Sequence, residues 1–560
     1  MAAMTKTPYT IDPDARPAAS LLLLRDGEAG LEVLMLRRAE RDGDMRSGAA
    51  VFPGGVLDAR DRAAHAHSTA ADDAAWSHAL QLGAGGLDYA VAALRETFEE
   101  VGLLLADRAV DVTALDGWRE ALQTSRSGVA ELCVAEGLKL DTAALAYHSH
   151  WLTPPGAPKR FDTRFFVAAA PLGQVAIADE GEALELMWLT PAGALETSRG
   201  LKLLPVTRRT LMDLGRFANA QDALTEARAR HHPQRIMPRR AASARGGVGS
   251  RIVLPDELPY AEVARLDPEG RADVLAELVA GTAVRLSPRI VRVTAPNPGP
   301  MTGPGTNSYL VSGDGGANWT AIDPGPVSAP HTAALLAAAA PGRIERILVT
   351  HTHRDHSPGA VALAQATGAP VLGRIAAFPQ GQDDTFVPRT PLEGGERLTL
   401  GADATLRVIH TPGHASNHLC FLLEEERLLF TGDHVMQGST VVINPPDGDM
   451  AAYLAALQAL LEEDIEWLAP GHGFLVAQPQ AVLRGLIAHR LRRESKAFFA
   501  VQSAGPATAR DLLPKVYDDV NPALHGVAER SLIAHLLKLK ADGRASEDAA
   551  GHWSAVQVAG

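Results

Sequence analysis

Residues 349–360 read VTHTHRDHSPGA and combine several side chains that bind metal ions. His351, His353, Asp355 and His356 lie within six positions and follow an apolar run that ends at Val349. Imidazole nitrogen is a ligand of zinc and iron, and a carboxylate can bridge two such ions. Because loops at strand ends carry the functional sites of many α/β folds, this segment predicts a metal site.

Three further strand-like runs in the second half of the chain also end in metal-ligating residues. LRVIHTPGH ends at His414, RLLFTGD ends at Asp433, and IEWLAPGH ends at His472. Seven candidate ligands are too many for one tetrahedral zinc, but they suit two ions about 3.5 to 4 Å apart. A lone histidine is usually a surface or capping residue, whereas four strand ends in succession favour a binuclear metal site.

The order HTHRDH, TPGH, TGD and PGHG resembles the metallo-β-lactamase superfamily of hydrolases. The resemblance implies an αββα sandwich with two zinc ions, or two ions of another transition metal. The first ion would be held by His351, His353 and His414. The second would be held by Asp355, His356 and His472, with Asp433 as a bridge. Asp355 would also orient the attacking hydroxide, and because no cysteine follows the pattern, antibiotic hydrolysis is not expected.

A second cluster lies in RETFEEVGL, which contains Arg95, Glu96, Glu99 and Glu100. Positions 96, 99 and 100 are spaced i, i+3 and i+4, so the three carboxylates share one helical face. A hard divalent cation would offset their repulsion and could bind a diphosphate. The alternative is an ordinary solvated, glutamate-rich helix face.

The segment FPGGVLD, followed later by RETFEEVG, resembles the Nudix box, and its split form resembles the peroxisomal coenzyme A diphosphatase type. Asp61 stands where the box has its first glutamate, and 33 residues rather than seven separate it from Arg95. The resemblance implies an α/β/α sandwich in which Glu99 and Glu100 bind Mg or Mn. Glu96 would be a ligand or base and Arg95 would orient a glutamate. Glu182 or Glu185 could add a ligand.

The strand-like and helical sequence patterns around these residues predict a multidomain α/β and α+β protein. The runs over 19–39 indicate a hairpin, and 88–106 indicates a helix with Asp88 as its N-cap. Helical patterns at 506–516 and 527–545 fit a winged helix. We therefore expect a Nudix-like domain at 10–235, a linker at 236–284, a metallo-β-lactamase-fold domain at 285–480 and a small winged-helix-like region at 481–560.

Composition narrows the class of protein further. The 560 residues are 46% hydrophobic and 21% charged, as in ordinary globular proteins. Two cysteines exclude a disulfide framework. The absence of a signal peptide and of a long apolar segment predicts a cytoplasmic protein without a membrane partner. The net charge of −13 argues against general nucleic-acid binding, although residues 484–545 carry a surplus of five positive charges.

Three functional hypotheses follow. The first is a bifunctional hydrolase that cleaves a small-molecule thioester at the histidine site and a coenzyme A-like or nucleotide diphosphate at the Nudix site. The second is cleavage of single-stranded RNA, because the entry segment and the helical tail resemble β-lactamase-like endoribonucleases. That subgroup also has fungal relatives that release polyketides from carrier-protein thioesters. In the third, the Nudix unit senses a nucleotide without turnover.

Overall fold

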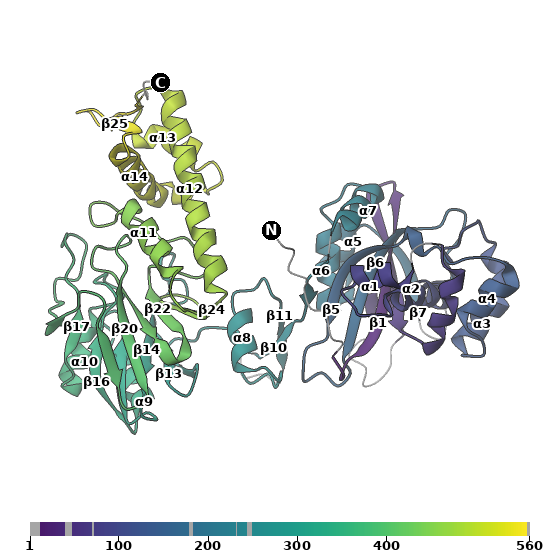
Figure 1. Cartoon of the computed structure of the whole chain (residues 1–560), viewed down its shortest axis with the longest axis horizontal. Helices are drawn as coiled ribbons and strands as arrows, with labels where there is room; N and C mark the ends of the chain where they lie inside the picture. The colour runs from purple at the N-terminus through teal and green to yellow at the C-terminus, as the bar shows by residue number, and fades with distance from the viewer. Residues whose placement is uncertain are drawn as a thin grey trace. The chain divides into compact units, whose positions relative to one another are not determined.

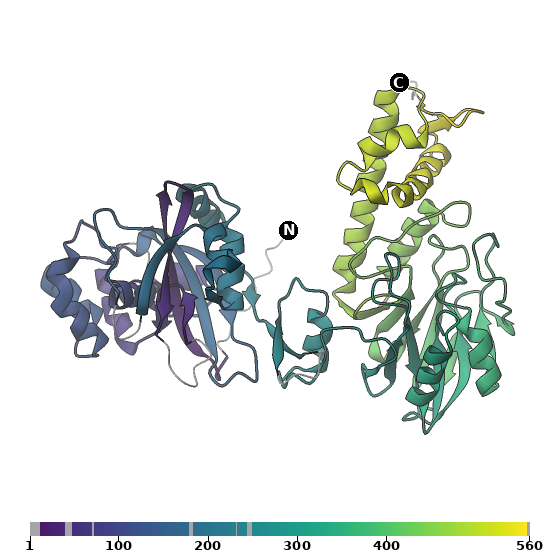
Figure 2. The same cartoon turned by 180° about the vertical axis from the view of Figure 1, so that it is seen from behind.

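The computed structural model describes residues 12–39, 47–69, 72–178, 183–230, 232–243 and 249–556. Glu182, considered above as an additional ligand, lies outside these residues. The chain forms two compact units, one made of Met1–Ala241, Ser250–Pro255 and Glu269–Asp273 and the other of the remaining residues (Figures 1 and 2). Among the described helices, none has the length and hydropathy needed to cross a bilayer.

The first unit contains a nine-stranded sheet with the order β8-β3-β2-β1-β6-β5-β9, to which β4 adds beside β1 and β7 beside β2. The strands are β1 (Arg16–Gly27), β2 (Gly30–Arg38), β3 (Ala49–Val51), β4 (Gly54–Val56), β5 (Ala146–Leu152), β6 (Phe161–Ala169), β7 (Ala183–Leu189), β8 (Lys202–Leu203) and β9 (Arg235–Ile236). The expected hairpin is present, because β1 and β2 are antiparallel with Gly27 opposite Gly30.

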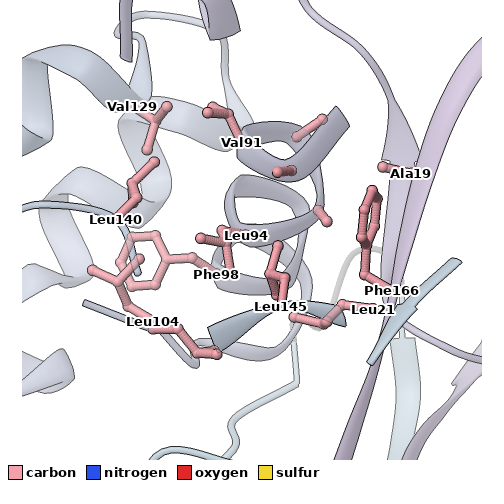
Figure 3. Packing of buried hydrophobic residues seen from close by; sticks show 14 of the residues in the cluster. Ala19, Leu21, Val91, Leu94, Phe98, Leu104, Val129, Leu140, Leu145 and Phe166 are labelled. Carbon is pink, nitrogen blue, oxygen red and sulfur yellow. The ribbon is translucent and has the colours of Figure 1, made fainter. Parts of the chain in front are cut away.

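Helices cover both faces of this sheet. On one face lie α1 (Asp73–Ala79), α2 (Gly86–Val101), α3 (Asp116–Gln123), α4 (Val129–Glu136) and the 3-10 turns η1 (Ala59–His67), η2 (Val112–Leu115) and η3 (Thr142–Ala144). On the other lie α5 (Pro191–Leu195), α6 (Pro205–Leu214) and α7 (Ala220–Ala229), with η4 (Thr197–Arg199) following α5. Leu21 packs in the α2 core (Figure 3) and Leu22 in the α6–α7 core, as strand alternation requires. The expected α/β/α sandwich is confirmed.

Helix α2 carries the glutamate cluster, and its bounds differ from the expected 88–106. It begins two residues earlier, because Gly85 in a left-handed conformation starts it and Asp88 lies in its first turn. It ends at Val101, where Gly102 takes φ +70° and closes the helix. Residues 103–105 are apolar and buried, and Ala106 is partly buried, but none of them is helical. This explains why the sequence pattern continued past the true end.

The second unit contains two sheets. The first is β12 (Ala283–Arg285), β13 (Ile290–Thr294), β14 (Asn307–Val311), β15 (Asn318–Ile322), β16 (Arg343–Leu348), β17 (Val371–Gly373) and β18 (Thr390–Pro391), in that order. The second is β19 (Arg397–Leu400), β20 (Ala404–His410), β21 (Leu419–Leu423), β22 (Leu428–Gly432), β23 (Trp467–Pro470) and β24 (Val476–Ala477), also in chain order. The 3-10 turn η5 (Glu424–Glu426) joins β21 to β22.

Three hydrophobic clusters pack the two sheets against each other and against their helices. Tyr309 and Leu348 of the first sheet pack against Phe421 and Phe430 of the second. The outer face of the first sheet is covered by α9 (Ala329–Ala339) and α10 (Gly359–Thr367). The outer face of the second is covered by α11 (Met450–Leu460) and the start of α12 (Pro479–Ala504). The expected αββα sandwich is confirmed.

The end of the chain forms a small helical region around the second half of α12. It contains α13 (Ala509–Val516), η6 (Pro522–Leu524), α14 (His525–Ala541) and a hairpin of β25 (Ala545–Glu547) and β26 (Trp553–Ala555). Leu512, Leu536 and Trp553 share one core with Val501 of α12. Helices followed by a hairpin are the arrangement of the expected winged-helix tail.

The segment 236–284, expected as a linker, contains regular elements. They are β10 (Arg239–Ala242), β11 (Ser250–Val253) and α8 (Tyr260–Leu266). Glu262 of α8 is 1% exposed and forms a bidentate ion pair with buried Arg292 of β13, at 2.6 and 2.8 Å. Part of the predicted linker therefore packs into the second unit. The glycine- and arginine-rich stretch 244–248 lies outside the described residues.

Candidate functional site

The seven histidine-site residues all lie in loops that follow strands of the second unit. His351, His353, Asp355 and His356 come after β16, whose last residue is Leu348. His414 follows β20, Asp433 follows β22, and His472 follows β23. Strand β15 is parallel to β16, and β22 is parallel to β23. Parallel neighbours end at the same edge, so the two sheets deliver these loops to one place.

The side chains form two groups, and the ligand atoms within each group lie within 4.8 Å of one another. One group is His351, His353 and His414, and the other is Asp355, His356, Asp433 and His472. The structure therefore brings together every residue that the sequence singled out here. Their role as ligands stays a prediction.

Asp433 faces both groups. Its Oδ1 lies 3.4 Å from His356 Nε2 and 3.3 Å from His472 Nε2, while its Oδ2 lies 3.8 Å from His414 Nε2. Each carboxylate oxygen thus points to a different group. Gly471 permits this packing, because a Cβ at that position would lie 2.7 Å from His356 Cε1 and 2.8 Å from Asp433 Oδ1.

The chemistry of this donor set fits metal ions. Four buried ligand atoms have no hydrogen-bond partner within the described part of the chain: His351 Nε2, His356 Nε2, His472 Nε2 and Asp433 Oδ1. Buried polar atoms are normally paired, since an unpaired one costs about 1 to 3 kcal/mol. Two cations would satisfy these atoms.

Neighbouring charged side chains strongly shift one another's pKa values in this site. Burial lowers the pKa of His472, but the carboxylates of Asp433 and Asp355 more than offset it and raise that pKa to about 9. Burial alone would raise the pKa of Asp433, whereas His472 and His356 outweigh it and hold the pKa well below its ordinary value. In the other group, burial lowers the pKa of His353 to about 3. One group therefore supplies neutral imidazoles and the other supplies anionic oxygen.

Asp323, which the sequence did not indicate, orients ligands of both groups. It follows β15, and its Oδ2 lies 2.9 Å from His356 Nδ1. The same oxygen accepts a hydrogen bond from Thr350 Oγ1 at 2.8 Å, and Thr350 Oγ1 lies 3.0 Å from His351 Nδ1. Partners of this kind fix the tautomer and direction of metal-binding histidines. The DPG turn that begins at Asp323 was the only signal for this residue.

Three further supports also escaped the sequence analysis. Buried His418 stacks on His351, with ring centroids 5.0 Å apart, and its Nε2 accepts a hydrogen bond from the backbone N–H of Asp433 at 3.2 Å. His414 Nδ1 lies 2.8 Å from the carbonyl oxygen of Val442, and His472 Nδ1 lies 3.2 Å from that of Gly305. Every residue has a backbone carbonyl oxygen, so the sequence cannot show which residue accepts these hydrogen bonds.

In the first unit, Arg95 forms ion pairs with acidic residues of the split Nudix box. Its guanidinium donates to Asp61 at 2.7 and 3.1 Å, to Glu96 at 2.7 Å and to Glu99 at 3.1 Å. It also donates to the carbonyl oxygen of Val56 at 2.9 Å. The insertion folds as η1 and α1. This places Asp61 beside Arg95, although the two residues are 34 positions apart in the sequence.

The glycines of FPGG lie against the glutamates. The backbone N–H of Gly54 donates to Glu100 Oε2 at 2.8 Å. A Cβ on Gly55 would lie 2.4 Å from the Glu96 carboxylate, so only glycine fits there without displacing that carboxylate. Burial raises the pKa of Glu96 to about 7, against the opposing effect of Arg95. Glu185, by contrast, is exposed on β7.

A cavity of about 460 Å³ opens beside this cluster. Glu96, Glu100 and the two glycines line one part of it, and Arg16, Arg38 and Lys159 also reach it. Carboxylates that suit a divalent cation and basic groups that suit phosphate therefore share one cavity.

Many basic residues of the tail pair with acids of the tail itself. Lys538 and Arg544 contact Glu494 at 3.2 and 3.5 Å, Arg493 contacts Asp519 at 2.7 Å, and Lys496 contacts Asp518 at 2.5 Å. The positive surplus that the sequence showed is thus partly neutralised within the tail.

Family models match three parts of the chain. Residues 301–472 match the metallo-beta-lactamase superfamily, residues 71–205 the NUDT19 Nudix domain, and residues 508–553 the beta-lactamase associated winged helix domain. An atrochrysone carboxyl ACP thioesterase of Aspergillus fumigatus is 30% identical over 259 residues, which are 41% of this chain and 74% of that protein. The chain belongs to the metallo-β-lactamase superfamily. It also carries a Nudix domain and a winged-helix tail.

Two further similarities are one to a sequence relative and one to a solved structure. The lactamase-like protein vrtG of Penicillium aethiopicum is 33% identical over 265 residues, which are 47% of this chain and 82% of that protein. A NUDIX hydrolase structure from Alicyclobacillus acidocaldarius is 31% identical, covers 38% of this chain and 96% of its own, and has a TM-score of 0.32. The family models assign two folds of hydrolytic families to this chain, and the protein is a hydrolase.

Proposed function

We propose that the histidine site is a binuclear metal centre that hydrolyses a thioester. The observation that carries this proposal is the position of Asp433, whose two carboxylate oxygens face the two groups. In this proposal His351, His353 and His414 hold one ion. Asp355, His356 and His472 hold the other, and Asp433 bridges the two. Zinc fits the imidazole-rich group, and other transition ions share that preference.

Two ions in such a site supply Lewis acidity that lowers the pKa of a water molecule and polarises a carbonyl oxygen. The chain's own residues do the rest. Asp355 is the most exposed of the acidic candidates, with 28% of its side chain accessible, and its Oδ2 lies 3.3 Å from His472 Nε2. We assign it the role of orienting the nucleophilic water and accepting its proton. His418 and Asp323 keep the ligand side chains in place.

The choice of a thioester is supported by the relatives. The protein of Aspergillus fumigatus is named as a thioesterase that acts on a carrier-protein-bound carboxyl group. Residues 301–472, which match the metallo-beta-lactamase superfamily model, contain all seven candidate ligands. A thioester carbonyl is a good electrophile for a metal-activated water, and the leaving thiol needs little assistance because its pKa is about 8.5.

We further propose that the Nudix domain hydrolyses a coenzyme A-like or nucleotide diphosphate. The Arg95 network and the basic residues in the adjacent cavity favour this second activity. Glu96, Glu99 and Glu100 would hold Mg or Mn, with Glu96 as ligand or base. An acyl-CoA thioester and then the diphosphate of the released coenzyme would be consecutive substrates of one chain.

A substrate panel tests both activities. Acyl-CoAs, coenzyme A, NADH, a nucleotide sugar and single-stranded RNA are offered to the wild type, to His353→Ala and to the double variant Glu99→Gln, Glu100→Gln. We expect thioester hydrolysis to be lost only in His353→Ala, and diphosphate hydrolysis only in the glutamate variant. Metal-dependent RNA cleavage without thioester hydrolysis would replace the thioesterase proposal with the endoribonuclease alternative. Diphosphate hydrolysis that survives the glutamate substitutions would exclude the assigned Nudix site.

A further inference from the structure

One irregular segment connects the metal site with the C-terminal helices. Residues 441–443 form neither helix nor strand. The carbonyl oxygen of Val442 lies 2.8 Å from His414 Nδ1. A carbonyl can only accept, so Nδ1 carries the proton and the lone pair of Nε2 faces the site. This oxygen therefore sets both the tautomer and the direction of the His414 ring.

The residues on both sides of Val442 are held by the C-terminal helices. Arg490 of α12 donates a hydrogen bond from Nη2 to the carbonyl oxygen of Val441. The backbone N–H of Ile443 donates to Ser531 Oγ of α14 at 3.3 Å. All of these contacts are buried, since Arg490 is 2% exposed and Ser531 is 5% exposed.

The guanidinium of Arg490 contacts the carbonyl oxygen of Val441 and the ring of Tyr453. Its guanidinium lies over the ring of Tyr453, 5.3 Å from the centroid. No carboxylate among the described residues forms an ion pair with it. A buried cation without a carboxylate partner is costly. An arginine in this place therefore needs a reason beyond packing, and its bond to Val441 supplies one.

Apolar packing makes the segment rigid as well. Val441 and Ile443 are 1% and 0% exposed and belong to the core that contains Leu483 of α12 and Ala534 of α14. The segment therefore has buried apolar contacts and directional hydrogen bonds to the same two helices. It cannot shift without disturbing both.

We propose that Arg490 and Ser531 are positioning residues for the metal centre. Through the segment 441–443 they fix the carbonyl that aligns His414, so the C-terminal helices set the metal affinity and geometry of the group of three histidines. This inference rests on the proposed function, in which His414 is a metal ligand. It gives the winged-helix tail a role inside the hydrolase that requires no nucleic acid.

The test is a titration of the metal-free, full-length protein with Co²⁺, whose visible absorption reports the geometry of its ligands. Loss of a supporting partner weakens metal binding about 10- to 100-fold. We expect Arg490→Met to weaken Co²⁺ binding about 10-fold and to alter the absorption band. Ser531→Ala, which removes one neutral hydrogen bond, should weaken it about fivefold. Arg490→Lys should recover most of the affinity, because it restores a donor in the same place.

Arg492→Met is the matched control, since Arg492 lies two residues along α12 and is exposed. It should bind Co²⁺ as the wild type does. Circular dichroism confirms that each variant is folded, and Ser531→Ala serves where Arg490→Met does not fold. Unchanged affinity and absorption in folded Arg490→Met, or in Ser531→Ala in its place, would overturn the inference alone. A wild type that binds no Co²⁺ would overturn the proposed function, and this inference with it.

Discussion

The buried contact between Asp61 and Arg95 supports a prediction about the split Nudix box. Asp61→Asn removes the charge that receives two hydrogen bonds from the guanidinium. Asp61 is 1% exposed and Arg95 is 7% exposed, so solvent cannot replace the lost partner. Breaking a buried ion pair costs about 3 to 5 kcal/mol. Glu96 and Glu99 remain bonded to Arg95, so we expect the lower end, about 3 kcal/mol.

An exposed ion pair of nearly the same length provides the control. Arg126 and Glu120 lie 2.6 Å apart, but their side chains are 60% and 71% exposed. Surface pairs contribute about 0 to 1 kcal/mol. Glu120→Gln makes the same acid-to-amide change as Asp61→Asn, so the two variants differ mainly in burial. We expect Glu120→Gln to leave stability nearly unchanged.

Differential scanning calorimetry measures the effect. For a unit of this size, each kcal/mol lowers the midpoint by about 2 to 4 °C, so Asp61→Asn should lower the transition of the first unit by about 6 to 12 °C. The transition of the second unit should not move, because Asp61 belongs to the first unit. Equal midpoints for Asp61→Asn and Glu120→Gln would refute the argument that Asp61 completes the box by pairing with buried Arg95.

Three further substitutions test the roles of Asp323, Gly55 and His331. Asp323→Ala should weaken zinc binding about 10- to 100-fold, and unchanged binding in a chelator competition would contradict its role in orienting both groups. Gly55→Ala should lower diphosphatase kcat, since its Cβ would displace the Glu96 carboxylate; a wild-type rate of formation of the two phosphomonoester products would contradict this. Burial lowers the pKa of His331 to about 4. As the pH drops from 6.5, the unfolded chain therefore binds a proton at this residue before the folded protein does, and the free energy of unfolding decreases. Between pH 6.5 and 5 the wild type should lose about 1.6 kcal/mol more than His331→Gln in urea unfolding, and equal losses would contradict the low pKa of His331.

The fold class was predictable because the motifs stand at the ends of apolar runs of strand length. His351, His414, Asp433 and His472 each follow such a run, and parallel strands carry the loops to one edge. The supports of these residues were not predictable. Val442 contributes only a carbonyl oxygen, which every residue has, so its contact with His414 depends on tertiary packing alone.

The first unit shows the same limit. The sequence pattern of α2 extended past Val101 because the next residues are buried without being helical. The return of Asp61 to Arg95 depends on how the insertion folds, and spacing alone could not show it. Glu262 fell within the predicted linker 236–284, but it pairs with Arg292, which lies 30 positions away in a buried strand.

In the proposed centre, two metal ions occupy the histidine site on either side of Asp433. Crystals of the zinc-loaded protein, with anomalous diffraction recorded at the zinc edge, test it most directly. We expect two anomalous peaks, one among His351, His353 and His414 and one among Asp355, His356 and His472, with Asp433 in contact with both. A single peak, or two peaks that Asp433 does not join, would contradict it.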